Sequence, residues 1–287
     1  MSTVTTTTLS AEMKTFYDMR LIDEASPMLV HEQFGQKRPI PQGGGKTVNF
    51  RRFSPLAKAT TALTEGVTPS GSSLSVSSIS AIVAQYGDYV VQSDVLELTA
   101  VDNTILETTK LLGRQAGLTM DTIVRNALLL GTNKSYAPKY VADTNGNLVE
   151  TEVTKTADLD TSAKLTVDVV QRVVAKLRAQ NAPTIGGDYV CIIHPYVAYD
   201  LMRDPEWIDA HKYATPENLY TGEIGKMAGV RFVQSTEAKI DKGGSDNPSG
   251  LAVFHCLFIG DGAYGVTEVT GGGLQTIVKQ KGSSGTA

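Results

Sequence analysis

The most regular apolar pattern in the chain predicts a long helix. Apolar residues recur at steps of three and four from position 105 to position 128, and Gly131 follows as a C-terminal stop signal. The pattern predicts a helix of about 27 residues, or about 40 Å at the usual rise per residue. Ser93 is a helix N-cap candidate upstream of it. Gly113 and Gly117 lower helix propensity, so we interpret them as points of close approach to another segment.

An earlier stretch has the period of strands. Apolar and polar residues alternate over Thr47–Phe53 and again from Leu74 onward, while the stretch Ser54–Ser73 between them is polar and marked by Gly and Pro. Lys46–Gln92 therefore predicts one long hairpin with a large polar tip. A change of phase at Ser77–Ser78 predicts a bulge or a change of face. Such a long loop is unusual inside a compact domain, so we expect an extended arm covered by another subunit.

The rest of the chain mixes helices and strands without a regular βαβ alternation. Helical spacing predicts helices at Thr166–Gln180 and Tyr196–Met202. Apolar runs predict strands at Tyr189–Ile193, Gly229–Ser235 and Leu251–Gly260, the last of them as a central strand. The order of elements favours an α+β fold over a doubly wound sheet.

The front of the chain has too few apolar residues to form a core of its own. Residues 1–10 are a Thr-rich polar tract, helical spacing covers Glu12–Glu32 with an interruption at Pro27, and Gly35–Lys46 is rich in Gly and Pro. We expect this part to lie on another surface, either the body of its own chain or a neighbour.

Composition narrows the function classes. The chain has 287 residues, of which 41% are hydrophobic and 20% are charged, as in ordinary globular proteins of one large or two closely connected domains. A net charge of -4 does not favour nucleic-acid binding by bulk electrostatics. No apolar run approaches the ~18 residues typical of a membrane span, and the start has no signal-peptide features, so we expect no membrane partner.

Reactive residue types gather between Tyr189 and Tyr213, in "YVCIIHPYVAYDLMRDPEWIDAHKY". Cys191 could pair with His194 or His211 as a nucleophile and its base. However, Cys191 lies in an apolar run, where burial disfavours the thiolate. We therefore predict no catalytic residue, and a cytosolic cysteine hydrolase that uses Cys191 and His194 remains the alternative.

Metal and nucleotide sites are also disfavoured. Four candidate zinc ligands fall on alternating positions of two predicted strands, so their side chains point to opposite faces: Cys191, His194, His255 and Cys256. The stretch "GGGKT" at Gly43–Thr47 lacks the first glycine of a phosphate-binding loop, because Ile40 occupies that position. We predict no metal and no cofactor.

Charged residues form two local groups. The basic group is either a solvated face or a contact to an acidic neighbour or nucleic acid, and it consists of Lys37, Arg38, Lys46, Arg51 and Arg52. The mixed group is either solvated or an interface cluster, and it consists of Asp200, Arg203, Asp204 and Glu206. Trp207, directly after it, is expected to pack between a helix and a sheet.

Three motifs in this order carry a resemblance to a known family: "HPYVAYDLMRDPEW" (His194–Trp207), "GEIGKMAGVRFVQS" (Gly222–Ser235) and "FIGDGAYGV" (Phe258–Val266). Together with the arm, hairpin and long helix, they resemble the major capsid proteins of tailed bacteriophages, which have the HK97-like fold. The resemblance extends from about residue 10 to residue 280.

The resemblance implies five parts of the α+β chain. They are an N-terminal arm (1–45), an extended β-hairpin loop (46–92), a peripheral domain with a spine helix (93–163), an axial domain (164–260) and return strands of the peripheral domain (261–287). Members of the family usually continue beyond the equivalent of Ala287 with a further strand-rich segment, whereas this sequence stops at "GSSGTA". We therefore expect one strand partner of the peripheral sheet to be missing.

The resemblance also implies a role. Copies of the chain would assemble as pentamers and hexamers into an icosahedral shell around double-stranded DNA, without sequence specificity and without enzymatic activity. A portal protein, and scaffolding or decoration proteins, would be further partners, and the virion would be assembled in the bacterial cytoplasm. A non-viral nanocompartment shell is an alternative. Candidate subunit contacts are Arg51, Arg52, Lys58, Glu65, Asp204 and Trp207.

Overall fold

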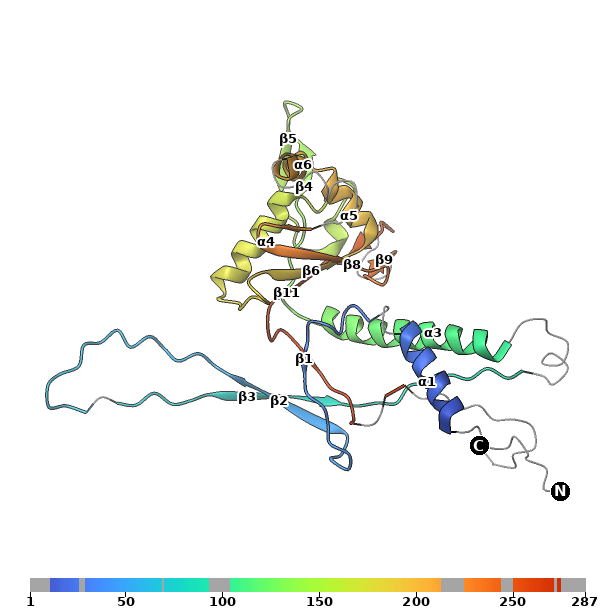
Figure 1. Cartoon of the computed structure of the whole chain (residues 1–287). Coiled ribbons are helices and arrows are strands. Elements are labelled where there is room, and N and C mark those ends of the chain that lie inside the picture. Colours follow the sequence, from blue (N-terminus) through green and yellow to red (C-terminus); the bar gives the residue numbers. More distant parts are fainter. Residues whose placement is uncertain are drawn as a thin grey trace, which may run out of the picture. The chain divides into compact units, whose positions relative to one another are not determined.

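The structure, a computed structural model, describes residues 11–25, 29–68, 70–92, 104–212, 225–243, 250–270 and 273–274. The chain divides into two compact units. The larger unit, here called the body, comprises residues 1–36, 89–264 and 275–287. The smaller one, the hairpin unit, comprises residues 37–88 and 265–274. Figure 1 labels most of the helices and strands and colours the chain from its N-terminus to its C-terminus.

A four-stranded sheet, the axial sheet, forms the centre of the body. Its order is β11-β6-β8-β7. Strand β6 (Tyr189–Ile193) pairs in parallel with β8 (Val230–Gln234) and antiparallel with β11 (Leu257–Ile259), and β7 (Lys226–Met227) lies antiparallel to β8. All five residues of β6 are buried, which explains its unbroken apolar sequence. The strands predicted at 189–193 and 229–235 are confirmed.

Three helices accompany this sheet. Helix α4 (Val167–Ala179) begins at Thr166, whose hydroxyl accepts a hydrogen bond from the Val169 N–H. Helices α5 (Pro195–Met202) and α6 (Pro205–Lys212) follow β6. Their apolar residues join one face of the sheet in a core cluster, whose buried members include Val170, Leu201 and Trp207. The helices predicted at 166–180 and 196–202 are confirmed.

The prediction of one central strand at 251–260 is wrong. The structure has two short strands there, β10 (Val253–Phe254) and β11, and β11 lies at the edge of the axial sheet. Strand β10 pairs instead with β9 (Ile240–Asp241). An apolar run has the same composition whether it pairs with one partner or changes partners midway, so its length did not reveal the break.

The predicted long helix is α3 (Thr104–Leu129), and helix α1 (Ala11–Ala25) packs against it. A Cβ on Gly113 would lie 2.8 Å from the Leu21 carbonyl oxygen, so the close approach predicted at Gly113 is confirmed. Of the two surfaces considered for the front of the chain, α1 therefore lies on its own body. The predicted N-cap, Ser93, is outside the described residues. None of the described helices is long and apolar enough to cross a membrane.

The covered face of α3 differs from the one that the apolar spacing predicted. Its buried residues are four apart and are all small or polar: Thr109, Gly113, Gly117 and Asp121. Met120, on the predicted apolar stripe, is exposed. The close approach of α1 explains this, because backbone near α3 leaves no room for large side chains.

A second hairpin in the body consists of β4 (Lys139–Ala142) and β5 (Leu148–Thr151), followed by the 3-10 turn η2 (Thr156–Asp158). Arg172 of α4 forms ion pairs with Glu150 of β5 and Asp168 of its own helix. Two-stranded hairpins are marginal alone, so these contacts hold the hairpin to α4.

The hairpin unit is built on β2 (Thr47–Phe53) and β3 (Val76–Ile82). Their seven pairs run without interruption from Thr47–Ile82 to Phe53–Val76, which confirms the predicted hairpin. The bulge or change of face predicted at Ser77–Ser78 is wrong, because both serines keep their register. Strands β1 (Gln36–Lys37) and β12 (Gly265–Val266) form a separate two-stranded ribbon.

Candidate subunit-contact surface

The hairpin unit exposes an unusually long stretch of chain. Every described residue from Arg51 to Ser80 is exposed, and 54–75 contains neither helix nor strand in its described part. Large apolar side chains occur throughout and are extensively exposed, as at Leu63 (76%). The others are Phe53, Leu56, Val67, Leu74, Val76, Ile79 and Ile82. Apolar surface gathered in this way marks an interaction site more often than a free surface.

The two faces of the β2–β3 ribbon differ. Val48 and Phe50 lie on one face beside their partners Ala81 and Ile79, and Val48, Phe50 and Ala81 are half-buried. The opposite face has exposed Phe53, Val76 and Ile82, with polar residues between them. The ribbon therefore has an apolar surface on each side, of which only one is partly covered by its own unit.

The covered face is closed by the segment that begins at Gly265. A Cβ at Gly265 would overlap the ring of Phe50, so any other residue there would require that ring to move. Nearby, the Ile40 N–H donates to the Glu268 carbonyl at 2.7 Å, and the Ile40 side chain is buried. The base of the hairpin thus has a small core of its own, which the tip lacks.

Four of the predicted contact residues lie on this exposed stretch. Arg51 and Arg52 are successive residues of β2 and therefore point to opposite faces, while Lys58 and Glu65 lie in the loop. None of the four forms an ion pair with another residue in the described ranges. Arg51 and Arg52, both of the basic group, therefore lie on opposite faces of the ribbon.

Asp204, the fifth predicted contact residue, is used inside the body. Its Oδ2 accepts a hydrogen bond from the Val167 N–H at 2.9 Å, at the start of α4. Its Oδ1 accepts one from the Glu206 N–H at 3.0 Å, at the start of α6. A carboxylate at two helix N-termini satisfies free donors and complements both helix dipoles. Asp204 therefore fixes α4 relative to α6.

Trp207, the sixth predicted contact residue, is only 4% exposed. Its ring packs edge-on against Phe232 of β8, with centroids 5.6 Å apart. This agrees with the expected packing between a helix and a sheet. Trp207 and Asp204 together hold the corner between α5 and α6 through contacts within the body.

The thiols are poorly suited to nucleophilic chemistry. Cys191 is fully buried in β6, and burial raises the pKa of its thiol well above the usual range. Burial also raises the pKa of Cys256 to about 12. Nucleophilic attack requires the thiolate, which is scarce under these conditions. Both cysteines are free thiols that pack in or against the core.

His194 has a structural role at the start of α5. Its Nδ1 accepts a hydrogen bond from the Tyr196 N–H at 3.2 Å, so the imidazole caps the helix. Desolvation lowers its pKa. The side chain of His211 lies outside the described residues. Within the described ranges, no group of three or more His, Cys, Asp or Glu side chains is arranged to hold a metal ion.

The sequence reasoning missed two important side chains in the body. His31 and Asp121 are both fully buried, and the His31 Nδ1 lies 2.7 Å from the Asp121 Oδ2. An aspartate four residues after Gly117, on the same face of a helix as two glycines, was the available signal. Its partner, 90 residues away, had no signal.

Comparison with known proteins identifies the family. A family model described as "Phage capsid protein" matches residues 76–284, which is well over half of the chain. A search of curated protein sequences finds no match.

Solved structures agree in fold. The capsid of Ralstonia phage GP4 superposes with a TM-score of 0.58 at 17% sequence identity, covering 81% of this chain and 73% of that one. The capsid of cyanophage P-SCSP1u superposes with a TM-score of 0.54 at 15% identity, covering 77% and 67%. At these identities the likeness concerns the fold, and it confirms the HK97-like fold predicted from the motifs. The five-part division stays a prediction.

Proposed function

The chain belongs to the phage capsid protein family, and we propose that its hairpin unit is the part that joins each subunit to the next. The protein is a major capsid protein that forms the shell of a virion. The family and the fold indicate a structural protein. What we propose is which surface of each subunit binds its neighbours in the shell.

One observation carries the proposal. From Arg51 to Ser80 every described residue is exposed, although this stretch includes apolar residues of the size usually found in cores. A stable protein–protein contact buries about 1,200–2,000 Å². An extended ribbon with a long loop supplies such an area at little cost in core residues, and a sister subunit is the partner that a shell of identical chains provides in every position.

The charged residues of the loop fit the same proposal. Lys58 and Glu65 carry opposite charges on the loop, and Arg51 and Arg52 lie nearby on β2. Charges at the rim of an apolar contact contribute more to orientation and specificity than to affinity. We therefore propose that the charged side chains set how neighbouring subunits align, and that the apolar side chains supply most of the binding free energy. The charged residues are Arg51, Arg52, Lys58 and Glu65.

Pentamers and hexamers are the proposed units of the shell, and double-stranded DNA is its proposed content. A net charge of -4 is compatible with this content, because confined DNA needs no affinity for the wall that encloses it. Many contacts acting together also make a shell stable while each contact stays reversible. Portal, scaffolding and decoration proteins are proposed partners of the same kind of shell.

A variant of the loop tests the proposal. Replacing Leu56, Leu63 and Val67 together by Ser removes apolar side chains that are each more than half exposed. We expect loss of large particles in size-exclusion chromatography and electron microscopy, with an unchanged unfolding midpoint of the subunit. Particles of normal size and yield would refute the role of the hairpin.

A matched control uses other exposed leucines. Leu130 and Leu148 are as exposed as Leu63 but lie in the body. Their replacement by Ser should leave particle formation intact if the contact surface is the hairpin. If this control abolishes particles equally, the shell depends on exposed apolar surface in general and the assignment to the hairpin fails.

A further inference from the structure

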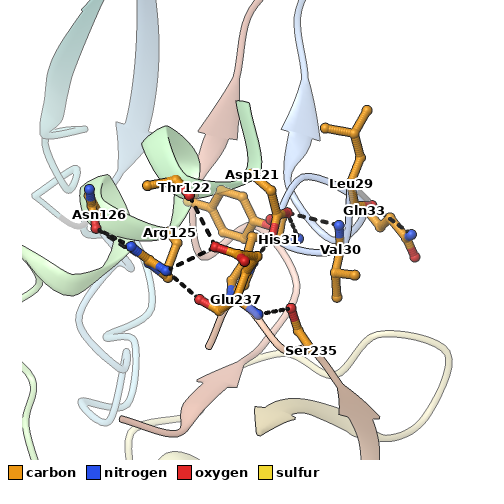
Figure 2. A network of polar contacts seen from close by, with 11 residues as sticks. Leu29, Val30, His31, Gln33, Asp121, Thr122, Arg125, Asn126, Ser235 and Glu237 are labelled. Carbon is orange, nitrogen blue, oxygen red and sulfur yellow. Dashed lines mark hydrogen bonds and ion pairs between the residues drawn. The ribbon is translucent and has the colours of Figure 1, made fainter. Parts of the chain in front are cut away.

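One turn of α3 carries the polar contacts of this helix to Glu237, just beyond β8, and to the segment that follows α1. Figure 2 shows Asp121, Thr122 and Arg125 of that turn pointing toward two other segments. Thr122 donates to the Glu237 Oε2 at 3.3 Å, and Arg125 contacts both the carboxylate and the carbonyl of Glu237, just beyond β8. Asp121 contacts the segment that follows α1. The turn thus faces the axial sheet and the arm at the same time.

The contacts of Asp121 are unusually complete. Its Oδ1 accepts hydrogen bonds from the N–H groups of Val30 and His31, at 2.8 and 2.7 Å, and its Oδ2 lies 2.7 Å from the His31 Nδ1 (Figure 2). A carboxylate has about four acceptor sites, so two backbone donors and a neighbouring imidazole nitrogen occupy most of its surroundings. Because both side chains are buried, no water competes for these bonds.

The same segment reaches the axial sheet with its apolar side chains. Val30 and Phe34 pack against a core cluster formed by Val190 and Ile192 of β6 and Ile259 of β11. This is the face of the sheet opposite to the one covered by α4, α5 and α6, since successive residues of β6 alternate between the two clusters. Tyr264, which belongs to this second cluster, donates its hydroxyl to the His31 carbonyl.

Among the described residues, helix α3 contributes no fully buried apolar side chain to the packing of the sheet. Neither of the two buried core clusters of the described residues contains a residue of α3, and its own buried positions are Thr109, Gly113, Gly117 and Asp121. Its apolar residues are only partly buried or exposed. Polar contacts from the turn 121–125 and the segment 29–34 therefore carry the connection of helix to sheet.

We propose that residues 29–34 are a strap that couples helix α3 to the axial sheet, with the His31–Asp121 pair as its clasp. The strap packs Val30 and Phe34 against one face of the sheet. On its other side, its backbone N–H groups and the His31 side chain contact Asp121 of the helix. Opening the clasp frees helix and sheet to change their relative angle, while each keeps its own core. The turn 121–125 is then the pivot, because its remaining contacts to Glu237 are polar and can reorient without exposing apolar surface.

The Nε2 of His31, unpaired within the described ranges, supports the view that the contacts with Asp121 hold the strap on the helix and are lost together. This atom is buried and has no hydrogen-bond partner among the described residues. An unsatisfied buried atom of this kind has a cost that only the surrounding bonds offset. Once all three contacts to Asp121 are lost, the His31 side chain keeps no hydrogen bond that the described residues show, and the strap is expected to leave the helix as a unit.

Two variants and two measurements test the strap. Asp121→Ala removes all three acceptor contacts, and Asp121→Asn keeps the Oδ1 acceptor for the backbone donors. We expect Asp121→Ala to raise amide hydrogen exchange in 29–34 roughly tenfold or more in the full chain, with exchange in β6 unchanged. A nitroxide pair on α3 and α6, attached at Leu111→Cys and Glu206→Cys and diluted with unlabelled chain, should show a broader distance distribution. Asp121→Asn should keep both the amide exchange of residues 29–34 and the nitroxide distance distribution close to those of the unchanged protein.

Glu107→Ala, on the exposed surface of the same helix, is the matched control and should change neither measurement. If Asp121→Ala leaves strap exchange and the nitroxide distances unchanged, there is no clasp. If β6 exchange rises together with the strap, Asp121 supports the whole fold and the coupling role is refuted. The strap would act in an isolated subunit as well as in a shell, so its failure leaves the shell proposal standing.

Discussion

The axial sheet and the extended hairpin are built from the same kinds of residues in opposite surroundings. All five residues of β6 are buried, whereas every described residue from Arg51 to Ser80 is exposed. Isoleucine and valine occur in both, at Ile192 and Val190 in the sheet and at Ile79 and Val76 in the hairpin. The same side chains stabilise the subunit in the first case, and in the second they are free to stabilise contacts between subunits.

This difference separates the stability of the subunit from its assembly into a shell, two properties that a substitution often changes together. Substitutions in the body should change the free energy of unfolding of the subunit, and assembly only as a consequence. Substitutions in the hairpin should change assembly and leave the unfolding of the subunit as it was. The following predictions test that separation, beginning with the largest effect.

The largest effect is expected from Trp207→Ala. Removing a buried aromatic ring that packs on Phe232 should lower the free energy of unfolding by about 3–5 kcal/mol. Leu63→Ala, at an exposed hairpin position, should change it by no more than about 0.5 kcal/mol. Denaturant titration of both variants as unassembled subunits measures this. Equal losses at the two positions would remove the distinction between body and hairpin.

The next largest effect on stability is expected at Gly113, for which Gly71 is the matched comparison. Gly113→Ala places a Cβ 2.8 Å from the Leu21 carbonyl oxygen and should destabilise α1 on α3 by about 1–3 kcal/mol, although alanine favours a helix. Gly71→Ala meets nothing within 4 Å and should be neutral or slightly stabilising. Thermal unfolding followed by circular dichroism distinguishes the two. A neutral Gly113→Ala would mean that α1 does not dock closely in solution.

A smaller effect concerns how the stability of the folded chain depends on pH. Desolvation lowers the pKa of His194, so the unfolded chain binds its proton at a higher pH than the folded chain does. His194 therefore reduces stability as pH falls through its ordinary pKa of about 6.5. His194→Asn keeps a capping oxygen and removes this titration, so unfolding midpoints at pH 7 and pH 5 should differ less than in the unchanged protein.

A residual pH dependence is expected in that variant from His255, whose pKa burial also lowers. Replacing both histidines should flatten the curve further. An unchanged difference between pH 7 and pH 5 in the double variant would show that other groups govern the acid response.

The smallest effect lies in a tight turn of the body. Ala228 has a φ of 53° in the two-residue turn between β7 and β8, where Met227 pairs with Val230. Ala228→Asn supplies the residue that such turns prefer before glycine and should raise stability by about 0.5 kcal/mol. A small rise in the thermal midpoint, with assembly unaffected, is the expected result. A lower midpoint would show that packing of the Ala228 methyl outweighs its backbone strain.

Several elements could be predicted because their signals are local. The spacing of apolar residues predicts α3 and α4, and alternation predicts the β2–β3 hairpin with its long tip. The ordered motifs predicted the fold and the family that the comparisons then showed. The hairpin residues proposed as contacts are exposed, and their contact role stays a prediction. Asp204 and Trp207 have partners within the chain that their position in the sequence did not reveal.

By itself, the sequence determined where helices and strands form and that the hairpin cannot bury its apolar residues alone, because both follow from spacing over a few residues. Only the tertiary structure decided which residues cover one another. It placed small and polar residues on the buried face of α3, and it divided the run at 251–260 between two partner strands. It also joined His31 to Asp121 and to Tyr264, which are 90 and 233 residues away. Contacts at such separations leave no periodic trace in the chain, because they depend on how whole elements pack.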